Sequence, residues 1–286
     1  MIVVTGATGG LGGATVEHLL RRVPADRIGV SVRDTAKARH LADRGVRVRV
    51  RQGSYEDPAA LRDSFAGAEQ VLLVSGNDPA ADLVGLHRHA VEAAVEAGAH
   101  RILYTSQQGA VPGNPYRPSD FHIATEAILG GSGVAWTALR NGAYGPLDQV
   151  LGPWQRTGVI AKPQDGPVPY TDRDDIAEAT AVVLAGDRPL DGPVNLTAPT
   201  AVTFDDLART ASDLTGRSVE RVVLDDDQWI ADQIATGVPE QMARLMLTYY
   251  QAARAGYFAE ADPLLAELLG REPRTVADRL AAHLAA

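Results

Sequence analysis

The chain has 286 residues, of which 45% are hydrophobic and 22% charged, so it can bury a sizeable core and has an ordinary globular composition. Its formal net charge of −9 argues against a nucleic-acid backbone as the main partner, although a local field can still attract a small anion. The absence of cysteine excludes disulfides, thiolate catalysis, iron–sulfur clusters and cysteine-ligated zinc. No run approaches the ~20 apolar residues of a membrane span and no signal-peptide pattern is present, so we expect a cytoplasmic protein.

Strand-like and helix-like segments alternate through the first half of the chain. Strands are expected at 1–6, 27–33, 46–54, 70–76 and 101–106, and a sixth strand with its exit loop at 134–144. Helices are expected at 10–23, 35–45, 57–67, 83–99 and 119–133. Beyond them, prolines and glycines are frequent over 145–170, a helix is expected at 174–186, a strand at 193–198, and mostly helix from about 205 onward. This order predicts an α/β fold, with a Rossmann-type doubly wound parallel sheet and a smaller, mainly helical C-terminal lobe.

The first predicted strand runs into a cluster of glycines, VVTGATGGLGG at 3–13. Gly6, Gly9 and Gly12 have the spacing G-x-x-G-x-x-G between a strand and a helix, which is the context of a dinucleotide site. In that reading Gly6 allows the sharp turn, Gly9 lets the backbone approach a pyrophosphate, and Gly12 lets the helix pack against the sheet. The alternative is a turn without function. We therefore expect residues 1–150 to form an NAD(P)-binding domain to which 172–198 return, and 151–171 and 199–286 to form a smaller substrate lobe.

The end of the second strand bears on which dinucleotide is bound. Arg33 stands at its tip and Lys37 follows about one helical turn later, an arrangement that suits a 2′-phosphate. Asp34 lies between them, either as the N-cap of the next helix or as a partner for a ribose hydroxyl. We expect NADPH rather than NADH, with no flavin and no metal. His87 and His89 are two positions apart on a helix, so they point to different faces and suit no shared metal ion.

Five stretches carry a family resemblance: TGATGGLG at 5–12, SVRDTAKARHLADRGV at 31–46, ILYTS at 102–106, HIATEAIL at 122–129 and LRNGAY at 139–144. Together they resemble the NmrA-like branch of the atypical short-chain dehydrogenases, including its quinone reductases, and the likeness continues through 172–184 and 204–217. Many members carry a lysine in the helix after the fifth strand, where this chain has Ala124. The resemblance implies NADPH bound by the following residues: Gly6, Thr8, Gly9, Gly10, Leu11, Gly12, Arg33, Lys37, Val74, Ser75, Gly76, Thr105, Ser106, Asn141 and Gly142.

The usual proton donor of short-chain dehydrogenases is missing, because none of the eight tyrosines is followed by lysine four residues later. A quinone acceptor fits this absence, since it takes up a hydride directly and water can supply the proton. The expected acceptor-site residues are Tyr144, His122 and Gln107, with Gln108 and Tyr104 as weaker candidates. Four of these five residues have a simpler explanation. His122 can have a structural role, Gln107 and Gln108 can be ordinary polar loop residues, and Tyr104 can pack in the core.

We therefore expect an NADPH-dependent oxidoreductase that acts on a quinone or a similar conjugated carbonyl. A non-catalytic NADP(H)-sensing regulator and a reductase of a natural-product carbonyl remain open alternatives. The expected partner is a small-molecule acceptor, without nucleic acid or membrane, and a homodimer is left open as the assembly.

Overall fold

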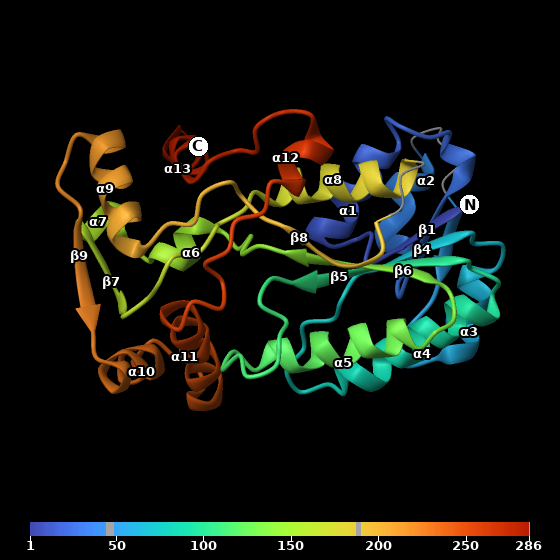
Figure 1. The fold of residues 1–286 in the computed structure, drawn as a ribbon, viewed down its shortest axis with the longest axis horizontal. Helices are drawn as coiled ribbons and strands as arrows, with labels where there is room; N and C mark the ends of the chain where they lie inside the picture. Colours follow the sequence, from blue (N-terminus) through green and yellow to red (C-terminus); the bar gives the residue numbers. More distant parts are fainter. Residues whose placement is uncertain (44–48, 187–189, 286) are drawn as a thin grey trace. The chain divides into compact units, whose positions relative to one another are not determined.

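The structure, a computed structural model, describes residues 1–43, 49–186 and 190–285, and the chain forms two compact units (Figure 1). The first unit comprises Met1–Gln107, Asp120–Asn141 and Arg173–Asn195. The second comprises Gln108–Ser119, Gly142–Asp172 and Leu196–Ala286. The chain therefore passes from one unit to the other five times.

A seven-stranded sheet with the order β3-β2-β1-β4-β5-β6-β8 forms the centre of the first unit. Its strands are β1 (Ile2–Thr5), β2 (Ile28–Val32), β3 (Arg49–Gln52), β4 (Gln70–Leu73), β5 (Arg101–Gln107), β6 (Ala135–Asn141) and β8 (Gly192–Leu196). The pairs from β3 through β6 are parallel, with Ile2 of β1 opposite both Ile28 and Gln70. The order of strands reverses between β1 and β4, where open α/β sheets bind their ligands. The predicted Rossmann-type sheet is confirmed.

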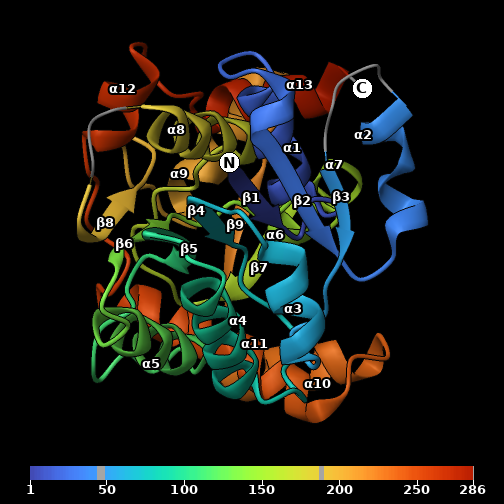
Figure 2. The same ribbon diagram turned by 90° about the vertical axis from the view of Figure 1, so that its right-hand side faces the viewer.

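Helices cover both faces of this sheet (Figure 2). They are α1 (Gly10–Leu19), α2 (Arg39–Asp43), α3 (Pro58–Phe65), α4 (Leu83–Glu96), α5 (Pro118–Gly130) and α8 (Arg173–Ala185), with 3₁₀ turns η1 (Ala25–Arg27) and η2 (Thr35–Ala38). Helices α1 and α8 lie side by side on one face, and α3, α4 and α5 lie on the other. Asp57 and Asp82 cap α3 and α4 by accepting from Ala60 N and Gly85 N, each at 3.0 Å.

The region predicted as one helix over 35–45 is instead the turn η2 followed by the short α2. Its predicted end at Gly45, and the start of the strand predicted at 46–54, lie outside the described residues. The predicted strand 70–76 is wrong in its last three residues, because β4 ends at Leu73.

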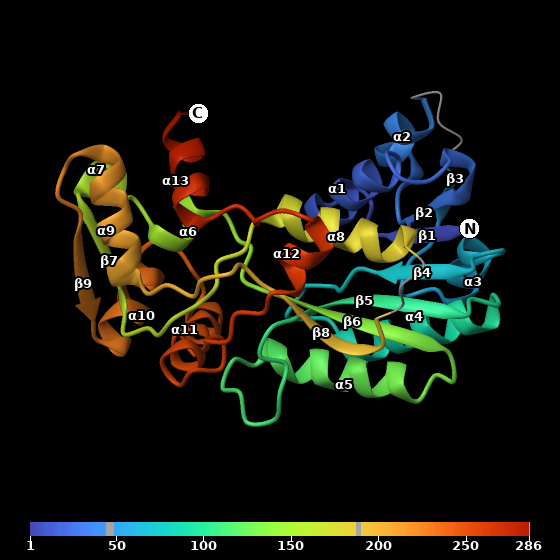
Figure 3. The same cartoon turned by 45° about the horizontal axis from the view of Figure 1, so that its top comes forward.

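The second unit contains a two-stranded parallel sheet of β7 (Val159–Pro163) and β9 (Glu220–Leu224), seen in Figure 3 beside α7 and α9. Its helices are α6 (Leu147–Leu151), α7 (Trp154–Thr157), α9 (Phe204–Thr215), α10 (Asp226–Ala235), α11 (Glu240–Arg254), α12 (Leu264–Leu269) and α13 (Val276–Ala285). Strand β9 interrupts a region predicted as mostly helical. The guanidinium of Arg221 on β9 donates to the carbonyls of Lys162 (2.8 Å) and Pro163 (2.6 Å), which joins the two strands.

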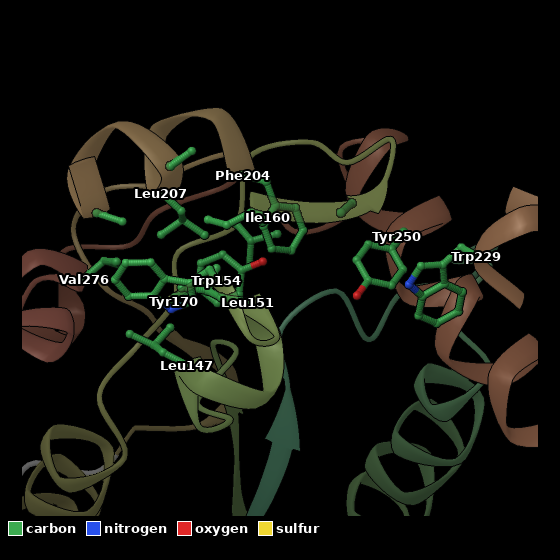
Figure 4. Packing of buried hydrophobic residues seen from close by; sticks show 14 of the residues in the cluster. Leu147, Leu151, Trp154, Ile160, Tyr170, Phe204, Leu207, Trp229, Tyr250 and Val276 are labelled. Atoms are coloured by element: carbon green, nitrogen blue, oxygen red, sulfur yellow. The ribbon is translucent and has the colours of Figure 1, made fainter. Parts of the chain in front are cut away.

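Aromatic side chains form the core of the second unit (Figure 4). Trp154 and Phe204 are almost fully buried in it, and Trp229 meets Tyr250 edge to face with ring centroids 5.2 Å apart. Each buried aromatic ring removes a large apolar area from water, so this unit has a core of its own. Among the described residues of the chain, no helix has both the length and the apolar character that crossing a membrane requires.

Candidate functional site

The loop between β1 and α1 folds back on itself through its glycines. Gly6 has φ +62, a left-handed conformation that glycine adopts without steric cost, and its carbonyl accepts from Gly9 N at 2.9 Å. A Cβ atom at Gly12 would lie 2.4 Å from the Gly6 carbonyl oxygen, so only glycine permits α1 to start this close to the loop. Thr8 and Gly10 are exposed, whereas Leu11 is buried.

Helix α1 begins without a side-chain cap, in contrast to α3 and α4. The first N–H groups of a helix have no partner within it, and the helix dipole makes this end positive. The exposed Arg173, at the start of α8, adds a cation: its Nη1 lies 2.6 Å from where a Cβ of Gly10 would be. Arg173 is not among the residues predicted from the sequence, where its only local signal is its position directly before the helix expected at 174–186. The loop thus gathers several donors and a positive charge, which suits a diphosphate.

The two cations after β2 are both exposed. Arg33 follows the strand directly and Lys37 lies in η2. Asp34 between them accepts the Ala36 N–H at 2.9 Å, so its carboxylate caps η2. Because the two cations outnumber this one carboxylate, the net charge of the tip is positive.

The segment Val74–Gly76 follows β4 at the point where the strand order reverses. Each of its three amide groups is held by a side chain from a different element: Val74 N–H donates to Thr5 (2.8 Å), Ser75 N–H to Thr105 (2.9 Å) and Gly76 N–H to His87 (3.1 Å). These side chains take the place of strand partners, which explains why β4 ends early. The N–H groups of this segment are thus occupied, which leaves carbonyl oxygens and the Ser75 hydroxyl as its groups for a ligand, and that hydroxyl lies 3.2 Å from the Thr105 hydroxyl oxygen.

Tyr55, before α3, adds to this arrangement. Its hydroxyl lies 2.9 Å from the Val74 carbonyl oxygen and 2.5 Å from the Thr5 hydroxyl oxygen. Burial raises the pKa of Tyr55, so the phenol stays protonated and able to donate. Tyr55 is not among the residues predicted from the sequence, because no motif next to it in the chain indicates a role in the site.

Two motifs of the sequence, HIATEAIL and LRNGAY, are joined by a partly buried ion pair. Arg140 on β6 binds Glu126 on α5 through two contacts, Nε to Oε1 at 3.0 Å and Nη2 to Oε2 at 2.6 Å. Ser106 on β5, also buried, donates to the same Oε1 at 2.7 Å. The carboxylate thus holds the carboxyl ends of β5 and β6 in place. Ser106 and Thr105 are both occupied by protein partners.

Asn141 is the last residue of β6, opposite Gln107 of β5. Only 3% of it is exposed, yet neither its Oδ1 nor its Nδ2 has a hydrogen-bond partner among the residues that the structure describes. A buried amide without partners costs roughly 1–3 kcal/mol, so such a group usually has an external partner. Gly142, the next residue, is the first of the second unit's Gly142–Asp172 segment, and a Cβ there would collide with the Thr171 hydroxyl oxygen.

The predicted acceptor-site residues are distributed over both units. His122, only 5% exposed, has its Nδ1 2.8 Å from the hydroxyl of the fully buried Tyr104. Burial, with a smaller effect of His87, lowers the pKa of His122 to about 3, so its ring is neutral at physiological pH. Gln107 ends β5 in the first unit, and Tyr144 belongs to the second.

Tyr144 is 37% exposed and is one of several large hydrophobic side chains on the surface of the second unit. It lies near Tyr116, whose pKa is raised by burial and then by Tyr144. Gln108 is buried and its amide donates to the carbonyls of Phe258 (3.1 Å) and Glu260 (2.6 Å), so it ties the C-terminal segment to its own loop. No group of three or more histidine, aspartate or glutamate side chains with the arrangement of a metal site occurs within the described ranges.

Known proteins resemble this chain over its whole length. A family described as NAD(P)H-binding matches residues 6–187. Quinone oxidoreductase 2 of Escherichia coli is 33% identical over 99% of this chain and 98% of its own, and an NmrA-like family domain-containing oxidoreductase of Aspergillus flavus is 29% identical over 95% and 91%. The structure of the NADPH-dependent quinone oxidoreductase QOR2 from Escherichia coli in complex with NADPH superposes with a TM-score of 0.92 at 32% identity and covers both chains fully.

Proposed function

Because the chain belongs to the NAD(P)H-binding family and is homologous to a quinone oxidoreductase, we propose that it transfers a hydride from NADPH directly to a quinone or a similar conjugated carbonyl. The relatives are described as oxidoreductases, and the solved structure is that of an NADPH-dependent one. The choice of NADPH and the class of acceptor are the parts that we infer.

The observation that carries the proposal is the buried, unpartnered amide of Asn141. It lies at the carboxyl edge of the sheet, opposite Gln107 and in the strand that Glu126 anchors through Arg140. A carboxamide ligand offers one acceptor and two donors, which is the complement of the Oδ1 and Nδ2 atoms left open here. The nicotinamide ring carries such a carboxamide.

The two loops at the point where the strand order reverses differ in the hydrogen-bonding groups that they present to a ligand. The glycine loop leads into the uncapped start of α1 at Gly10, whose first N–H groups have no side-chain partner, and it lies beside Arg173, so it suits the diphosphate. The segment Val74–Gly76 has its amides occupied and presents acceptors, so it suits ribose hydroxyls and amide donors. The residues present therefore fit a dinucleotide with its nicotinamide half toward β4, β5 and β6. When bound, the reduced nicotinamide supplies the hydride.

Two observations favour NADPH over NADH. Arg33 and Lys37 are both exposed after β2, so their charges remain available to a phosphate. Asp34, which in the alternative interpretation binds a ribose hydroxyl, uses one oxygen to cap η2. A 2′-phosphate placed between two cations gains charge-assisted hydrogen bonds, whereas a bare hydroxyl gains little from them.

The class of acceptor is inferred from the weakness of the proton donors among the predicted site residues. His122 is neutral and buried, and Tyr104 is buried with a pKa raised by burial, so neither provides a strong acid. A conjugated carbonyl that accepts a hydride becomes a delocalised anion, which water or one weak hydrogen-bond donor can protonate. The chain's task is then to hold the two reactants in contact, at ~3–3.5 Å.

Purified protein, NADPH and 1,4-benzoquinone test the proposal. We expect a loss of absorbance at the nicotinamide band whose rate is proportional to protein concentration, and a lower rate with NADH at equal concentration. Asn141→Leu serves as the matched control, because it keeps the branching and the number of side-chain heavy atoms and removes the amide, and we expect a lower rate from it. Binding of NADPH without oxidation by any quinone of a panel would support the sensing regulator instead. Activity restricted to non-quinone carbonyls would support the natural-product reductase.

A further inference from the structure

His87 on α4 is a fully buried imidazole in the first unit that the predicted site does not use. Its Nε2 lies 3.1 Å from the Gly76 amide nitrogen, and its Nδ1 lies 2.9 Å from the Thr125 hydroxyl oxygen. That hydroxyl in turn lies 2.7 Å from the Phe121 carbonyl oxygen. The ring thus connects the segment after β4 with helix α5.

The protons of this chain of contacts can be assigned by elimination. A backbone N–H only donates, so Nε2 of His87 must accept and carries no proton. In a neutral ring the proton is then on Nδ1, from which it donates to Thr125. The Thr125 hydroxyl is left to donate to the Phe121 carbonyl, which only accepts. The tautomer of His87 and the orientation of its ring are therefore both determined by buried partners.

The surroundings keep this ring neutral. Tyr104 of β5 has its hydroxyl 3.5 Å from Nδ1, His122 of α5 binds that hydroxyl, and Tyr55 and Phe121 meet the ring edge to face. No carboxylate is among these contacts. Burial lowers the pKa of His87 to about 4, so the acceptor nitrogen is available at physiological pH.

His87 completes the set of three side chains that hold Val74–Gly76. Thr5 and Thr105 fix the first two amides from β1 and β5, and His87 fixes the third from α4. Loss of the His87 acceptor would leave the Gly76 amide without this anchor and the end of the segment less constrained.

We propose that His87 is a positioning residue that fixes the Val74–Gly76 segment for the nicotinamide half of the cofactor. This rests on the proposed function, in which the segment's acceptors face the nicotinamide ribose and carboxamide. The adenosine half, which meets Arg33 and the glycine loop in that proposal, does not depend on His87. The effect of His87 must therefore be selective for one half of the same ligand.

This selectivity is tested by comparing a ligand that has the nicotinamide half with one that lacks it. Dissociation constants are measured for NADPH and for adenosine 2′,5′-bisphosphate, which lacks the nicotinamide half, in the unsubstituted protein, His87→Phe and His87→Gln. Phenylalanine fills the space without an acceptor, whereas glutamine offers an oxygen to Gly76 and an N–H to Thr125. For His87→Phe we expect about tenfold weaker NADPH binding and a lower kcat with benzoquinone, with the bisphosphate unchanged, as loss of one anchoring hydrogen bond predicts. For His87→Gln we expect values within about twofold of the parent.

The outcomes separate the two proposals. Failure of the unsubstituted protein to bind NADPH would refute the proposed function and this inference with it. Two other outcomes would overturn this inference alone, provided that the parent binds NADPH tightly. In the first, His87→Phe binds NADPH as tightly as the parent. In the second, His87→Phe binds NADPH and the bisphosphate more weakly by the same factor. If His87→Phe does not fold, Thr125→Val replaces it, because it removes the group that orients the ring. A selective loss of NADPH affinity is again expected, and an unchanged ratio of the two dissociation constants is again the contradicting result.

Discussion

Acidification should destabilise the first unit through its two buried imidazoles. Burial lowers the pKa of His87 to about 4 and that of His122 to about 3, whereas in the unfolded chain both have the ordinary value of 6.5. Below pH 6.5 the unfolded chain therefore takes up protons that the folded chain does not. By proton linkage, the free energy of unfolding must fall as the pH falls from 6.5 toward 4.

The size of the effect follows from these pKa values. At pH 5 an unfolded histidine is almost fully protonated and a folded His87 is still largely neutral, so each ring costs about 2 kcal/mol between pH 7 and pH 5. The two together cost about 4 kcal/mol, a large part of the ~5–15 kcal/mol that stabilises a typical domain. His87→Gln removes one of the two titrations, so the loss between the two pH values should shrink by about 2 kcal/mol.

Urea unfolding of the parent and of His87→Gln at pH 7 and pH 5 measures this difference. Comparison within each protein cancels any change in stability that the substitution causes at neutral pH. Glutamine keeps both hydrogen bonds of the ring but does not titrate, so it isolates the charge. Equal acid-induced losses in the two proteins would show that His87 is protonated as readily in the folded chain as in the unfolded one, and would refute the reasoning.

Four further substitutions test the assignments in the site. Arg33→Asp should raise the Kd of NADPH at least tenfold while that of NADH changes little; equal losses would contradict a 2′-phosphate contact. Arg173→Gln should weaken both cofactors about tenfold and reduce the salt dependence of binding, as titrations at two ionic strengths would reveal. Asn141→Leu should weaken NADPH about tenfold yet leave the melting temperature of the free protein unchanged or higher, since it removes an unpaired buried amide; a clearly lower melting temperature would argue against that amide being unpaired. Gly12→Ala should lower the free energy of unfolding by at least about 2 kcal/mol because its Cβ meets the Gly6 carbonyl, and a neutral result in urea would disprove this close approach.

Local patterns were sufficient to predict the parts of the fold that depend on near neighbours. The strand before Gly6, the cap at Asp57 and the helix starting at Gly10 all follow from a few adjacent residues, and all occur as expected. Strand β9 does not, because its partner β7 lies about sixty residues earlier and its exposed valines Val222 and Val223 give no alternating pattern.

The same distinction holds for the candidate site. The sequence pointed to the segment Val74–Gly76 but assigned its residues to a strand, since nothing nearby shows that Thr5, Thr105 and His87 hold its amides. Arg173 reaches the glycine loop only because α8 packs beside α1. These contacts join residues that lie between 11 and more than 160 positions apart in the chain, so single-sequence patterns do not report them.

The five passages of the chain between its two units limit how the protein can be divided. A polypeptide ending before Arg173 would lack α8, the neighbour of α1, and the edge strand β8, so its Rossmann sheet would be incomplete. Transplanting the second unit from a relative would require three separate segments to be exchanged together, with every junction kept in register. Recombination at one site within 108–195 therefore yields chimaeras in which both units mix two parents, whereas point changes leave the arrangement intact.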